Sequence, residues 1–444
     1  MEQDFVRGIY AIGCDGMFDS PGSYRLLYSP FNGKMALVDE KEWAGIREGL
    51  MRGSEDPRIR ELINDSSIDE VHDLPVKSVK DVVKLSVLPT NKCNFACSYC
   101  YSREGRDATQ VSRETLDRTL EYFIDPSRTE KRELTISYLG GGEPMLCWEL
   151  FRHSLDYSEF LASKYGFRLM NSVNTNGSIL TDDILDCLLR HDVTVCVTFE
   201  VFEDIQEAQR GQWRRVRENI HAMLERGVRV IISSIITPLN VDRIERLVRI
   251  VTEEYPGVRT LILEPVVDMT STNFKSLQEI SDLYKAYAKG FFCALPVAEA
   301  HGVRLLNSVI RKMWRLHTRF CDGEISLTAL GTISGCTSVS SPREAYYEQY
   351  CYGDANVSPI KIDNAHFEDL LRRDVFSYPQ CRGCFLKWHC AGGCSFRNDL
   401  YTPGQMEIVC DFNRDFALKY LLNVLEHNLK LEGDELSEMI KNGQ

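Results

Sequence analysis

The most informative stretch of the sequence is LSVLPTNKCNFACSYC, residues 85–100. Its start, Leu85 to Leu88, is typical of a short buried strand, so the following loop lies at a strand's carboxyl end, where α/β sheets place ligands. That loop carries Cys93, Cys97 and Cys100 with the spacing C-x3-C-x2-C. Iron-sulfur clusters in electron-transfer proteins usually have four cysteine ligands. Three thiolates can hold three irons of a 4Fe-4S cube and leave the fourth iron for a substrate or a cofactor.

A zinc site or a set of three core thiols is the alternative interpretation, since cysteine is common in both. A zinc site would need a fourth protein ligand nearby. After Cys100, however, no cysteine or histidine follows until Cys147 and His153. We therefore favour the iron-sulfur interpretation.

The cysteine spacing, with Tyr99 before the third cysteine, resembles that of the radical SAM enzymes. In that family S-adenosyl-L-methionine (SAM) binds the free iron and is cleaved to a 5'-deoxyadenosyl radical, which abstracts a hydrogen atom. The resemblance implies that Cys93, Cys97 and Cys100 ligate the radical SAM cluster and that Tyr99 belongs to the cofactor site.

From about residue 84 to 270, short apolar runs alternate with amphipathic helical runs, which is typical of repeated β/α units around a parallel sheet. The expected strands are Leu85–Leu88, Leu134–Leu139, Phe167–Val173, Val193–Phe199, Val228–Ile236 and Arg259–Val266. Helices are expected near Arg113–Ile124, Trp148–Tyr165, after Thr181, and between Gln212 and Arg226. Six such units match the partial (β/α)6 TIM-like barrel of radical SAM cores.

A glycine-rich run, Gly140 to Pro144, follows the second expected strand. Backbone without side chains can approach a ligand closely, and a carboxylate can receive an ammonium group. The run resembles the family's GGEP motif, which implies that Gly141, Gly142 and Glu143 hold the amino group of SAM. An ordinary glycine-rich turn is the alternative.

The third expected strand ends in SVNTNG, residues 172–177. This resembles the family's S-x-Q-T-N-G segment, with Asn174 in place of the usual glutamine. The resemblance implies that Ser172 faces the SAM ribose and that Asn176 belongs to the cofactor site.

The fourth expected strand departs from the family pattern. Relatives read roughly S-L-D-G-P, whereas this chain reads TFEVF at residues 198–202, so Glu200 replaces the aspartate and the glycine-proline turn is missing. Glu200 is a cofactor-site candidate and a weak catalytic candidate. Arg210 matches the arginine that follows this strand, and a guanidinium suits the SAM carboxylate. A solvated Arg210 on a helix surface is the alternative.

Seven cysteines form a second cluster in the last quarter of the chain. Cys321 and Cys336 come first, and the run C-x2-C-x5-C-x3-C and a final cysteine follow at Cys381, Cys384, Cys390, Cys394 and Cys410. A zinc ribbon is the alternative for the C-x2-C part. The whole pattern resembles the SPASM domain, which carries two auxiliary 4Fe-4S clusters.

The SPASM resemblance implies a ligand set for each auxiliary cluster. The outer cluster would be held by Cys381, Cys384, Cys390 and Cys410, and the inner cluster by Cys321, Cys336 and Cys394. The inner set is one ligand short. Either Cys351 supplies the fourth ligand or a substrate thiolate does, and the second case would favour coupling of sulfur to carbon.

Composition limits the possible partners. The chain has 444 residues, too many for one compact core, and 65 acidic against 52 basic residues, a net charge of −13. This charge argues against nucleic acid or an anionic membrane as a partner and suits a basic leader peptide. No signal peptide pattern and no run of eighteen apolar residues is present, so we expect a cytoplasmic protein. Its sixteen cysteines then indicate metal ligation rather than disulfides.

Three domains are expected, at residues 1–80, 81–305 and 306–444. In the first, Tyr24–Tyr28 and Lys34–Val38 flank an Asn-Gly turn, and a helix is expected near Lys41–Met51. This resembles the winged-helix-like recognition element (RRE) that binds leader peptides by strand addition, and a plain packing appendage is the alternative. Residues 65–80 are expected to be linker, and a final helix is expected from Asp411 to about Leu429.

The resemblance implies a radical SAM/SPASM maturase that modifies a ribosomally synthesised precursor peptide (a RiPP maturase) by forming a thioether (sulfur-to-carbon) or other side-chain crosslink, of which we favour the thioether. Its cofactors would be SAM and three 4Fe-4S clusters, and its electron donor a flavodoxin or ferredoxin type reductant. The alternatives are a sulfatase-maturating enzyme that makes formylglycine, a peptide epimerase, and a non-enzymatic electron-transfer protein. The sequence does not indicate the peptide, the residues joined or the general base.

Overall fold

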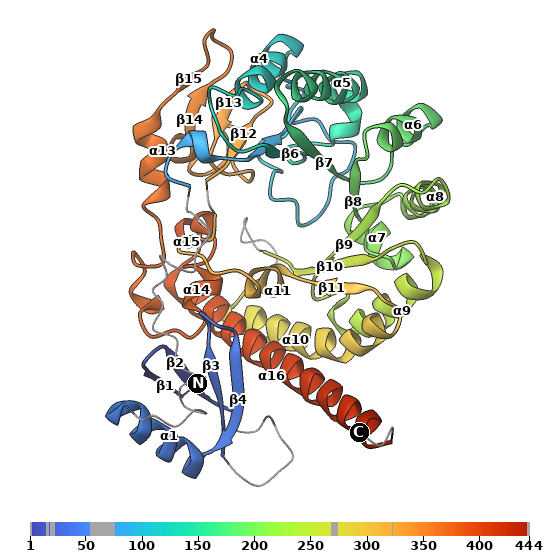
Figure 1. Cartoon of the computed structure of the whole chain (residues 1–444). Coiled ribbons are helices and arrows are strands. Elements are labelled where there is room, and N and C mark those ends of the chain that lie inside the picture. Colours follow the sequence, from blue (N-terminus) through green and yellow to red (C-terminus); the bar gives the residue numbers. More distant parts are fainter. Residues whose placement is uncertain are drawn as a thin grey trace.

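The computed structural model describes residues 2–14, 17, 23–53, 76–267, 274–321 and 323–441, with side chains described up to residue 428. It contains a small four-stranded sheet near the amino terminus and an eleven-stranded sheet that forms the body of the molecule (Figure 1). In the described residues, no helix is both long and apolar enough to cross a membrane.

All six expected strands of the barrel are present and pair in parallel in chain order. They are β5 (Lys84–Val87), β6 (Glu133–Tyr138), β7 (Arg168–Thr175), β8 (Thr194–Thr198), β9 (Val230–Ile236) and β10 (Thr260–Pro265). Two strands that the sequence analysis missed extend this sheet: β11 (Arg304–Leu306) pairs with β10, and β12 (Ile325–Leu327) pairs with β5. Among the described strands β11 does not pair with β12, so the expected partial, open barrel is confirmed.

Helices cover the outer face of the parallel strands, as Figure 1 shows. They are α4 (Arg113–Phe123), α5 (Trp148–Tyr165), α6 (Asp182–Arg190), α7 (Glu203–Gln209), α8 (Trp213–Glu225), α9 (Ile244–Glu254) and α10 (Leu277–Ala300). Two of the expected starts are capped as the sequence indicates: Ser112 accepts a hydrogen bond from the Thr115 N–H, and Thr181 accepts one from the Ile184 N–H.

The strands bury one face beneath the helices and turn the other toward the barrel lumen. Along β9, for example, Val230 and Ile232 are buried, whereas Ile231 and Ser233 are partly exposed. Successive side chains of a strand point to opposite faces, so the partly exposed series lines the lumen. Polar lumen-facing residues near the strand ends are therefore candidates for contact with a ligand.

The sheet continues beyond β12 through short antiparallel strands, β13 (Thr332–Ser334), β14 (Cys351–Asp354) and β15 (Lys361–Ile362). The helices of this part are α11 (Ser308–Met313), α12 (Tyr347–Tyr350), α13 (Asn364–Leu371), α14 (Lys387–Cys390) and α15 (Ser395–Leu400). One sheet thus crosses the boundary expected at residue 305, and the three-domain division stays a prediction.

The last helix, α16 (Pro403–Lys441), begins eight residues before the expected start at Asp411. Proline is well tolerated in the first turn of a helix, and the Thr402 hydroxyl accepts a hydrogen bond from the Gln405 N–H at 3.4 Å. The rings of Phe412 and Phe416 pack on the aromatic side chains of α10. The helix is therefore fixed to the outside of the barrel.

The amino-terminal element contains β1 (Gln3–Val6), β2 (Ile9–Gly13), β3 (Tyr24–Ser29), β4 (Lys34–Asp39) and α1 (Glu40–Arg52). The expected hairpin, β3 and β4, and the expected helix are present, and β1 and β2 were not expected. The Tyr28 hydroxyl lies 2.5 Å from Nε2 of His389 on α14, so the element packs against the carboxyl-terminal cysteine region. Most of the expected linker lies outside the described residues, and the winged-helix likeness stays a prediction.

Candidate active site

A cavity of about 630 Å³ opens at the carboxyl ends of the parallel strands. It collects most of the residues that the sequence analysis selected, from four separate segments of the chain: Cys93, Cys97, Tyr99, Cys100, Gly141, Gly142, Glu143, Asn176 and Arg210. Ser172 and Glu200 are not among its lining residues. The cavity is therefore the place where a cofactor would meet the three cysteines.

The cysteine loop is held by contacts that suit negatively charged sulfur. Arg106 donates from Nη2 to Sγ of Cys100 at 3.0 Å and from Nη1 to the carbonyl oxygen of Phe95. The Phe95 N–H donates to Sγ of Cys93 at 3.5 Å. Burial raises the pKa of Cys97, and the positive charge of Arg210 opposes that shift.

Three thiols facing a cavity beside a guanidinium are a suitable donor set for an iron-sulfur cluster. Within the described parts of the chain, no three cysteine, histidine or carboxylate side chains are arranged as the ligands of a single metal ion. The assignment of a cluster to Cys93, Cys97 and Cys100 therefore depends on the donor chemistry and stays a prediction.

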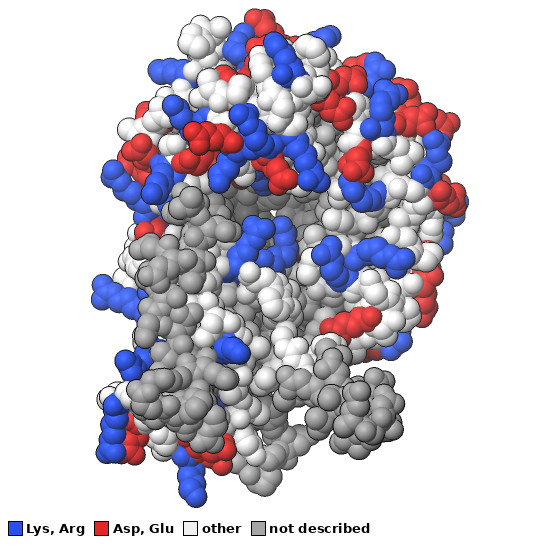
Figure 2. Space-filling model, viewed as in Figure 1, with Lys and Arg blue, Asp and Glu red and all other residues white. Residues whose placement is uncertain are grey.

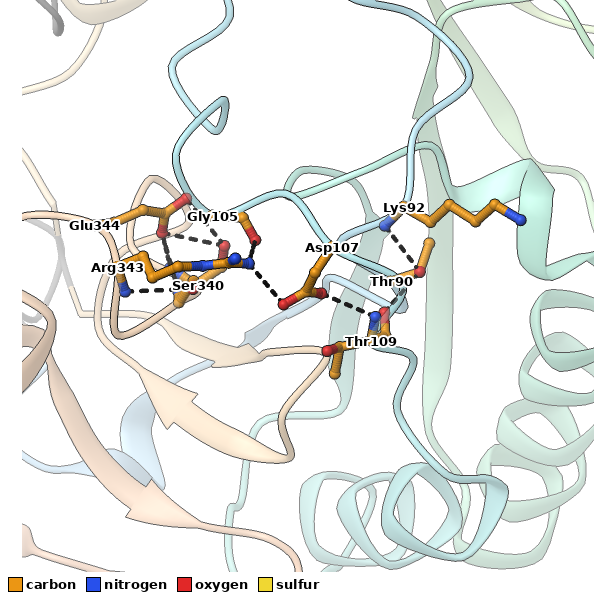
Figure 3. Close-up of polar contacts among 9 residues, drawn as sticks. Thr90, Lys92, Gly105, Asp107, Thr109, Ser340, Arg343 and Glu344 are labelled. Atoms are coloured by element: carbon orange, nitrogen blue, oxygen red, sulfur yellow. Dashed lines mark hydrogen bonds and ion pairs between the residues drawn. The ribbon is translucent and has the colours of Figure 1, made fainter.

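The segment that contains the cysteine loop is fastened to the chain that follows Cys336 (Figure 3). Arg343 donates from Nη2 to the carbonyl oxygen of Gly105 at 2.9 Å and to Oδ2 of Asp107 at 2.6 Å. The Thr90 hydroxyl donates to the carbonyl oxygen of Thr109 at 2.8 Å, which closes the base of the loop. These contacts tie the segment that contains the cysteine loop to the segment that follows Cys336.

Glu143 is 2% exposed, and its carboxylate already accepts three hydrogen bonds. The donors are the Thr175 hydroxyl at 2.7 Å, the Asn176 N–H at 2.7 Å and the Met145 N–H at 3.1 Å. Burial raises the pKa of Glu143, and these hydrogen bonds oppose the shift. A carboxylate offers about four acceptor positions, so one is left for an ammonium group in the cavity.

The cysteine loop leaves no room for a side chain at Gly142. A Cβ atom at this position would lie 2.0 Å from the carbonyl oxygen of Lys92. The Gly142 N–H donates to the carbonyl oxygen of Thr90 at 2.8 Å, and the Glu143 N–H donates to that of Lys92 at 2.9 Å. The sequence analysis attributed the glycine run to close approach of a ligand, whereas this glycine allows close approach of the neighbouring loop.

Tyr99 and Arg210 form one network with the buried Glu200. The Tyr99 hydroxyl donates to Glu200, which also accepts from the Ser234 hydroxyl at 2.7 Å and is 0% exposed. Arg210 donates from Nη1 to the Tyr99 hydroxyl at 2.9 Å. Its Nε is buried and has no hydrogen-bond partner among the described residues. Arg210 lines the cavity, where a guanidinium suits a carboxylate, and Glu200 lies behind Tyr99 rather than on the cavity wall.

The missing glycine-proline turn after β8 is replaced by a strained turn at Val201. Val201 has φ 65°, and the Phe202 N–H donates to the carbonyl oxygen of Glu200 at 2.7 Å, which makes a γ-turn. A β-branched residue rarely adopts positive φ. The Trp213 indole N–H donates to the carbonyl oxygen of Val201 at 2.7 Å and supports the turn. The departure in sequence therefore coincides with local backbone strain beside the network.

Ser172 lies on the lumen side of β7, two residues before Asn174, which does line the cavity. The Ser172 hydroxyl is 2.9 Å from that of Ser137 on β6. It is therefore deeper in the lumen than the cavity wall, and the ribose contact that the resemblance implied stays a prediction.

The carboxyl-terminal cysteines gather around two smaller cavities. Cys381, Cys384, Cys390 and Cys410 line one of about 90 Å³, which Cys394 also reaches. A second, of about 40 Å³, is lined by Cys321, Cys336 and Cys394. Cys351 lines neither of these cavities. Burial raises its pKa to about 11, and hydrogen bonds from Tyr347, Thr332 and Ser334 offset part of that rise. Because Cys394 lines both cavities, the two ligand sets named above stay a prediction.

Among the cavity residues that the sequence analysis missed are Glu264, Thr337 and Ser338. Thr337 and Ser338 follow Cys336 directly, but no local pattern indicates that their segment returns to the barrel. Glu264 had a usable signal, because it is a carboxylate within the apolar run LILEPV, residues 261–266. A charged residue inside a buried strand indicates a lumen-facing position.

Comparison with known proteins agrees with this site. A family model described as the radical SAM superfamily matches residues 87–251. The radical SAM cyclopropyl synthase TigE of Paramaledivibacter caminithermalis is 19% identical over 338 residues, which cover 72% of this chain and 69% of TigE.

Two solved structures are similar in fold. Native anSMEcpe with bound AdoMet has a TM-score of 0.64 at 15% identity, and the match covers 78% of this chain and 99% of anSMEcpe. Streptococcus suis SuiB bound to precursor peptide SuiA has a TM-score of 0.51 at 13% identity, with 91% of this chain and 98% of SuiB covered. The family match at residues 87–251 and the similarity to TigE show that the chain is an enzyme with a radical SAM domain, and the two solved structures share its fold.

Proposed function

We propose that this enzyme modifies a ribosomally synthesised precursor peptide, and that its product contains a thioether crosslink between a cysteine sulfur and a carbon of another residue. The observation that carries this proposal is the composition of the cavity wall. One side is the cysteine loop with Cys93, Cys97 and Cys100, and another is Thr337 and Ser338, directly after Cys336. A substrate in the cavity would lie between the radical site and the inner auxiliary cysteines.

The residues present suit the cofactors that this function needs. When bound, SAM and its 4Fe-4S cluster supply a 5'-deoxyadenosyl radical that takes a hydrogen atom from the substrate. Cys93, Cys97 and Cys100 would hold the cluster, the free acceptor position of Glu143 would receive the amino group of SAM, and Arg210 would pair with its carboxylate.

The inner auxiliary set supports sulfur chemistry in particular. Three cysteines line its cavity, and Cys351 is not one of them. The sulfur of Cys351 instead has hydrogen bonds with the side chains of Tyr347, Thr332 and Ser334. An inner 4Fe-4S cluster held by Cys321, Cys336 and Cys394 would then have one iron to which a substrate thiolate could bind. The outer cluster, with its four cysteines, would be fully ligated and would pass electrons.

A peptide substrate is also supported by the related structures. SuiB was solved bound to its precursor peptide SuiA, and anSMEcpe was solved with AdoMet and the Cp18Cys peptide. Among the described strands, the outer strand β4 of the amino-terminal sheet pairs on one side only, with β3. An unpaired strand edge can accept an extended peptide by strand addition, so this element would bind the leader. A flavodoxin or ferredoxin type protein would supply the electron.

Mass spectrometry of candidate precursor peptides co-expressed with the enzyme tests this proposal. The expected product is lighter by two hydrogens and has one fewer thiol that can be alkylated. The matched control carries Cys93→Ala, Cys97→Ala and Cys100→Ala and should leave the peptide unchanged. Loss of two hydrogens with no loss of a thiol that can be alkylated would indicate a different oxidation. Uptake of deuterium without loss of two hydrogens would indicate epimerisation. Either result would contradict the thioether proposal.

A further inference from the structure

Glu264 occupies a distinctive position among the acidic residues of the active-site cavity. It lies at the end of β10, on the lumen side, across the barrel from the cysteine loop on β5. Of the described acids that line the cavity, Glu143 already accepts three hydrogen bonds and holds the β6 and β7 loops together. Glu264 is partly exposed to the cavity and takes no part in the Tyr99, Glu200 and Arg210 network. It is therefore the lining carboxylate free to meet a substrate.

We propose that Glu264 is the residue that contacts the substrate and accepts the proton released when the peptide is oxidised. This inference rests on the proposed function. Making a thioether from a C–H and an S–H group removes two hydrogens. One leaves as a hydrogen atom, taken from carbon by the deoxyadenosyl radical. The other leaves the thiol as a proton, which Glu264 takes, while the remaining electron passes to the auxiliary iron-sulfur clusters as the carbon–sulfur bond forms.

The surroundings of Glu264 suit a base that works near neutral pH. Burial raises its pKa from 4.5 to about 7, and hydrogen bonding by Ser308 and the charges of Arg311 and Arg397 limit the rise. The phenols of Tyr284 and Tyr287 on α10 also face it and are themselves kept neutral by burial. A general base is most effective when its pKa is close to the working pH.

The same neighbours give the proton a way out of the barrel. Ser308 and Arg311 line a second cavity, of about 1170 Å³, between the amino-terminal ends of β5, β11 and β12. Figure 2 shows the face of the molecule hollowed near its middle, with Lys and Arg side chains beside the hollow. Glu264 thus lies between the active-site cavity and the side chain of Ser308, which lines the second cavity. A proton accepted from the substrate can leave without crossing the SAM site.

The test compares Glu264→Gln with the wild-type enzyme, using reconstituted protein, SAM and a precursor peptide deuterated at the reacting carbon. SAM binding, and deuterium transfer into 5'-deoxyadenosine, should stay within about twofold of wild type, because glutamine keeps the shape of the site. Crosslinked product should fall by about 100-fold or more, the contribution typical of a general base. Glu264→Asp should restore part of the product.

The pH dependence separates this role from a structural one. Wild-type product formation should rise with pH through about 7, because only the deprotonated carboxylate accepts the proton. Ser308→Ala removes a hydrogen bond that lowers the pKa, so its profile should move to higher pH, and Glu264→Gln should lose this dependence. A purely structural role would reduce the rate equally at every pH.

Each possible result of these experiments either supports or overturns the role assigned to Glu264. Wild-type product with little product from Glu264→Gln, and with deuterium transfer retained, supports the assignment. Equal product from both proteins, or loss of SAM binding in Glu264→Gln, overturns it while the proposed function stands. No crosslinked product from wild type, with SAM cleavage intact, overturns the proposed function and the role of Glu264 together.

Discussion

The two cysteine-rich regions of this enzyme are built for different tasks. The amino-terminal one presents three thiols to a cavity of about 630 Å³ at the mouth of the barrel. In the carboxyl-terminal one, Cys381, Cys384, Cys390 and Cys410 enclose a cavity of about 90 Å³, covered by α16. The open site has room for a cofactor and a substrate, whereas the enclosed site has room for little beyond a cluster. Ligand exchange is therefore expected at the first region and electron transfer at the second.

The largest effects are expected when the cysteines of each region are replaced in turn. Replacing Cys93, Cys97 and Cys100 with alanine should remove about four irons from a protein expected to hold about twelve. Because no open iron would be left for SAM, cleavage of SAM should be abolished. Iron analysis and the yield of 5'-deoxyadenosine measure both effects.

The matched variant replaces Cys381, Cys384 and Cys410 with alanine. It should also lose about four irons but should retain SAM cleavage in the absence of peptide, because this cavity is separate from the SAM site. If both variants kept SAM cleavage, or if both lost it with folding intact, the proposed division between the two regions would be wrong.

The next effect concerns the packing of the open region. Gly142→Ala places a Cβ atom 2.0 Å from the carbonyl oxygen of Lys92, so the cysteine loop must move. We expect a loss of about 3 kcal/mol in the free energy of unfolding and strongly reduced SAM cleavage. Gly45→Ala in α1 is the control: nothing lies within 4 Å of the added Cβ, so it should stabilise by roughly 0.5–1 kcal/mol. Denaturant unfolding compares the two.

A smaller effect is expected from Tyr99→Phe. The lost hydroxyl joins Arg210 to Glu200, so Arg210 would no longer be held toward the cavity. A hydrogen bond to a charged group contributes about 1.5–3 kcal/mol, and we expect the dissociation constant of SAM to rise by about 10-fold. Tyr165→Phe, at the far end of α5, is the control. Equilibrium binding that showed no difference between the two variants would refute the network's role.

The smallest effect should come from the contact between the two regions. Arg343 and Asp107 are about half and one-third exposed, and such pairs contribute about 0.2–1 kcal/mol. Arg343→Ala should therefore lower the melting temperature only slightly, by about 2 °C. Arg229→Ala breaks the exposed pair with Asp192, remote from both regions, and is the control. If Arg343→Ala unfolded the protein, the contact would contribute far more to stability than its exposure predicts, and this prediction would be wrong.

The sequence predicted the regular part of the fold because long, periodic elements carry a local signal. The six central strands and the helices α4, α5, α6 and α8 were found in this way, whereas α7, α9 and α10 were not predicted. β11 and β12 were missed because each has three residues, too few for a period to be recognised. The start of α16 was placed too late because Pro403 and Gly404 are usually turn residues.

The site was predictable only where its residues carry fixed spacings. Cys93, Cys97 and Cys100 are close in sequence, and all three reach the cavity. Thr337 and Ser338 join it from more than two hundred residues away, through the pairing of β12 with β5. No local pattern encodes such a contact. The position of Glu200 behind Tyr99 likewise follows from tertiary packing.

The measurement that tests the account most directly is electron paramagnetic resonance of the reduced enzyme in which the auxiliary cysteines have been replaced. The remaining signal comes from the loop that begins at Cys93. Addition of SAM labelled with ¹⁵N in its amino group should change this signal and add a nitrogen hyperfine coupling. A spectrum unchanged by SAM would mean that the loop offers no open iron, and the central claim would be contradicted.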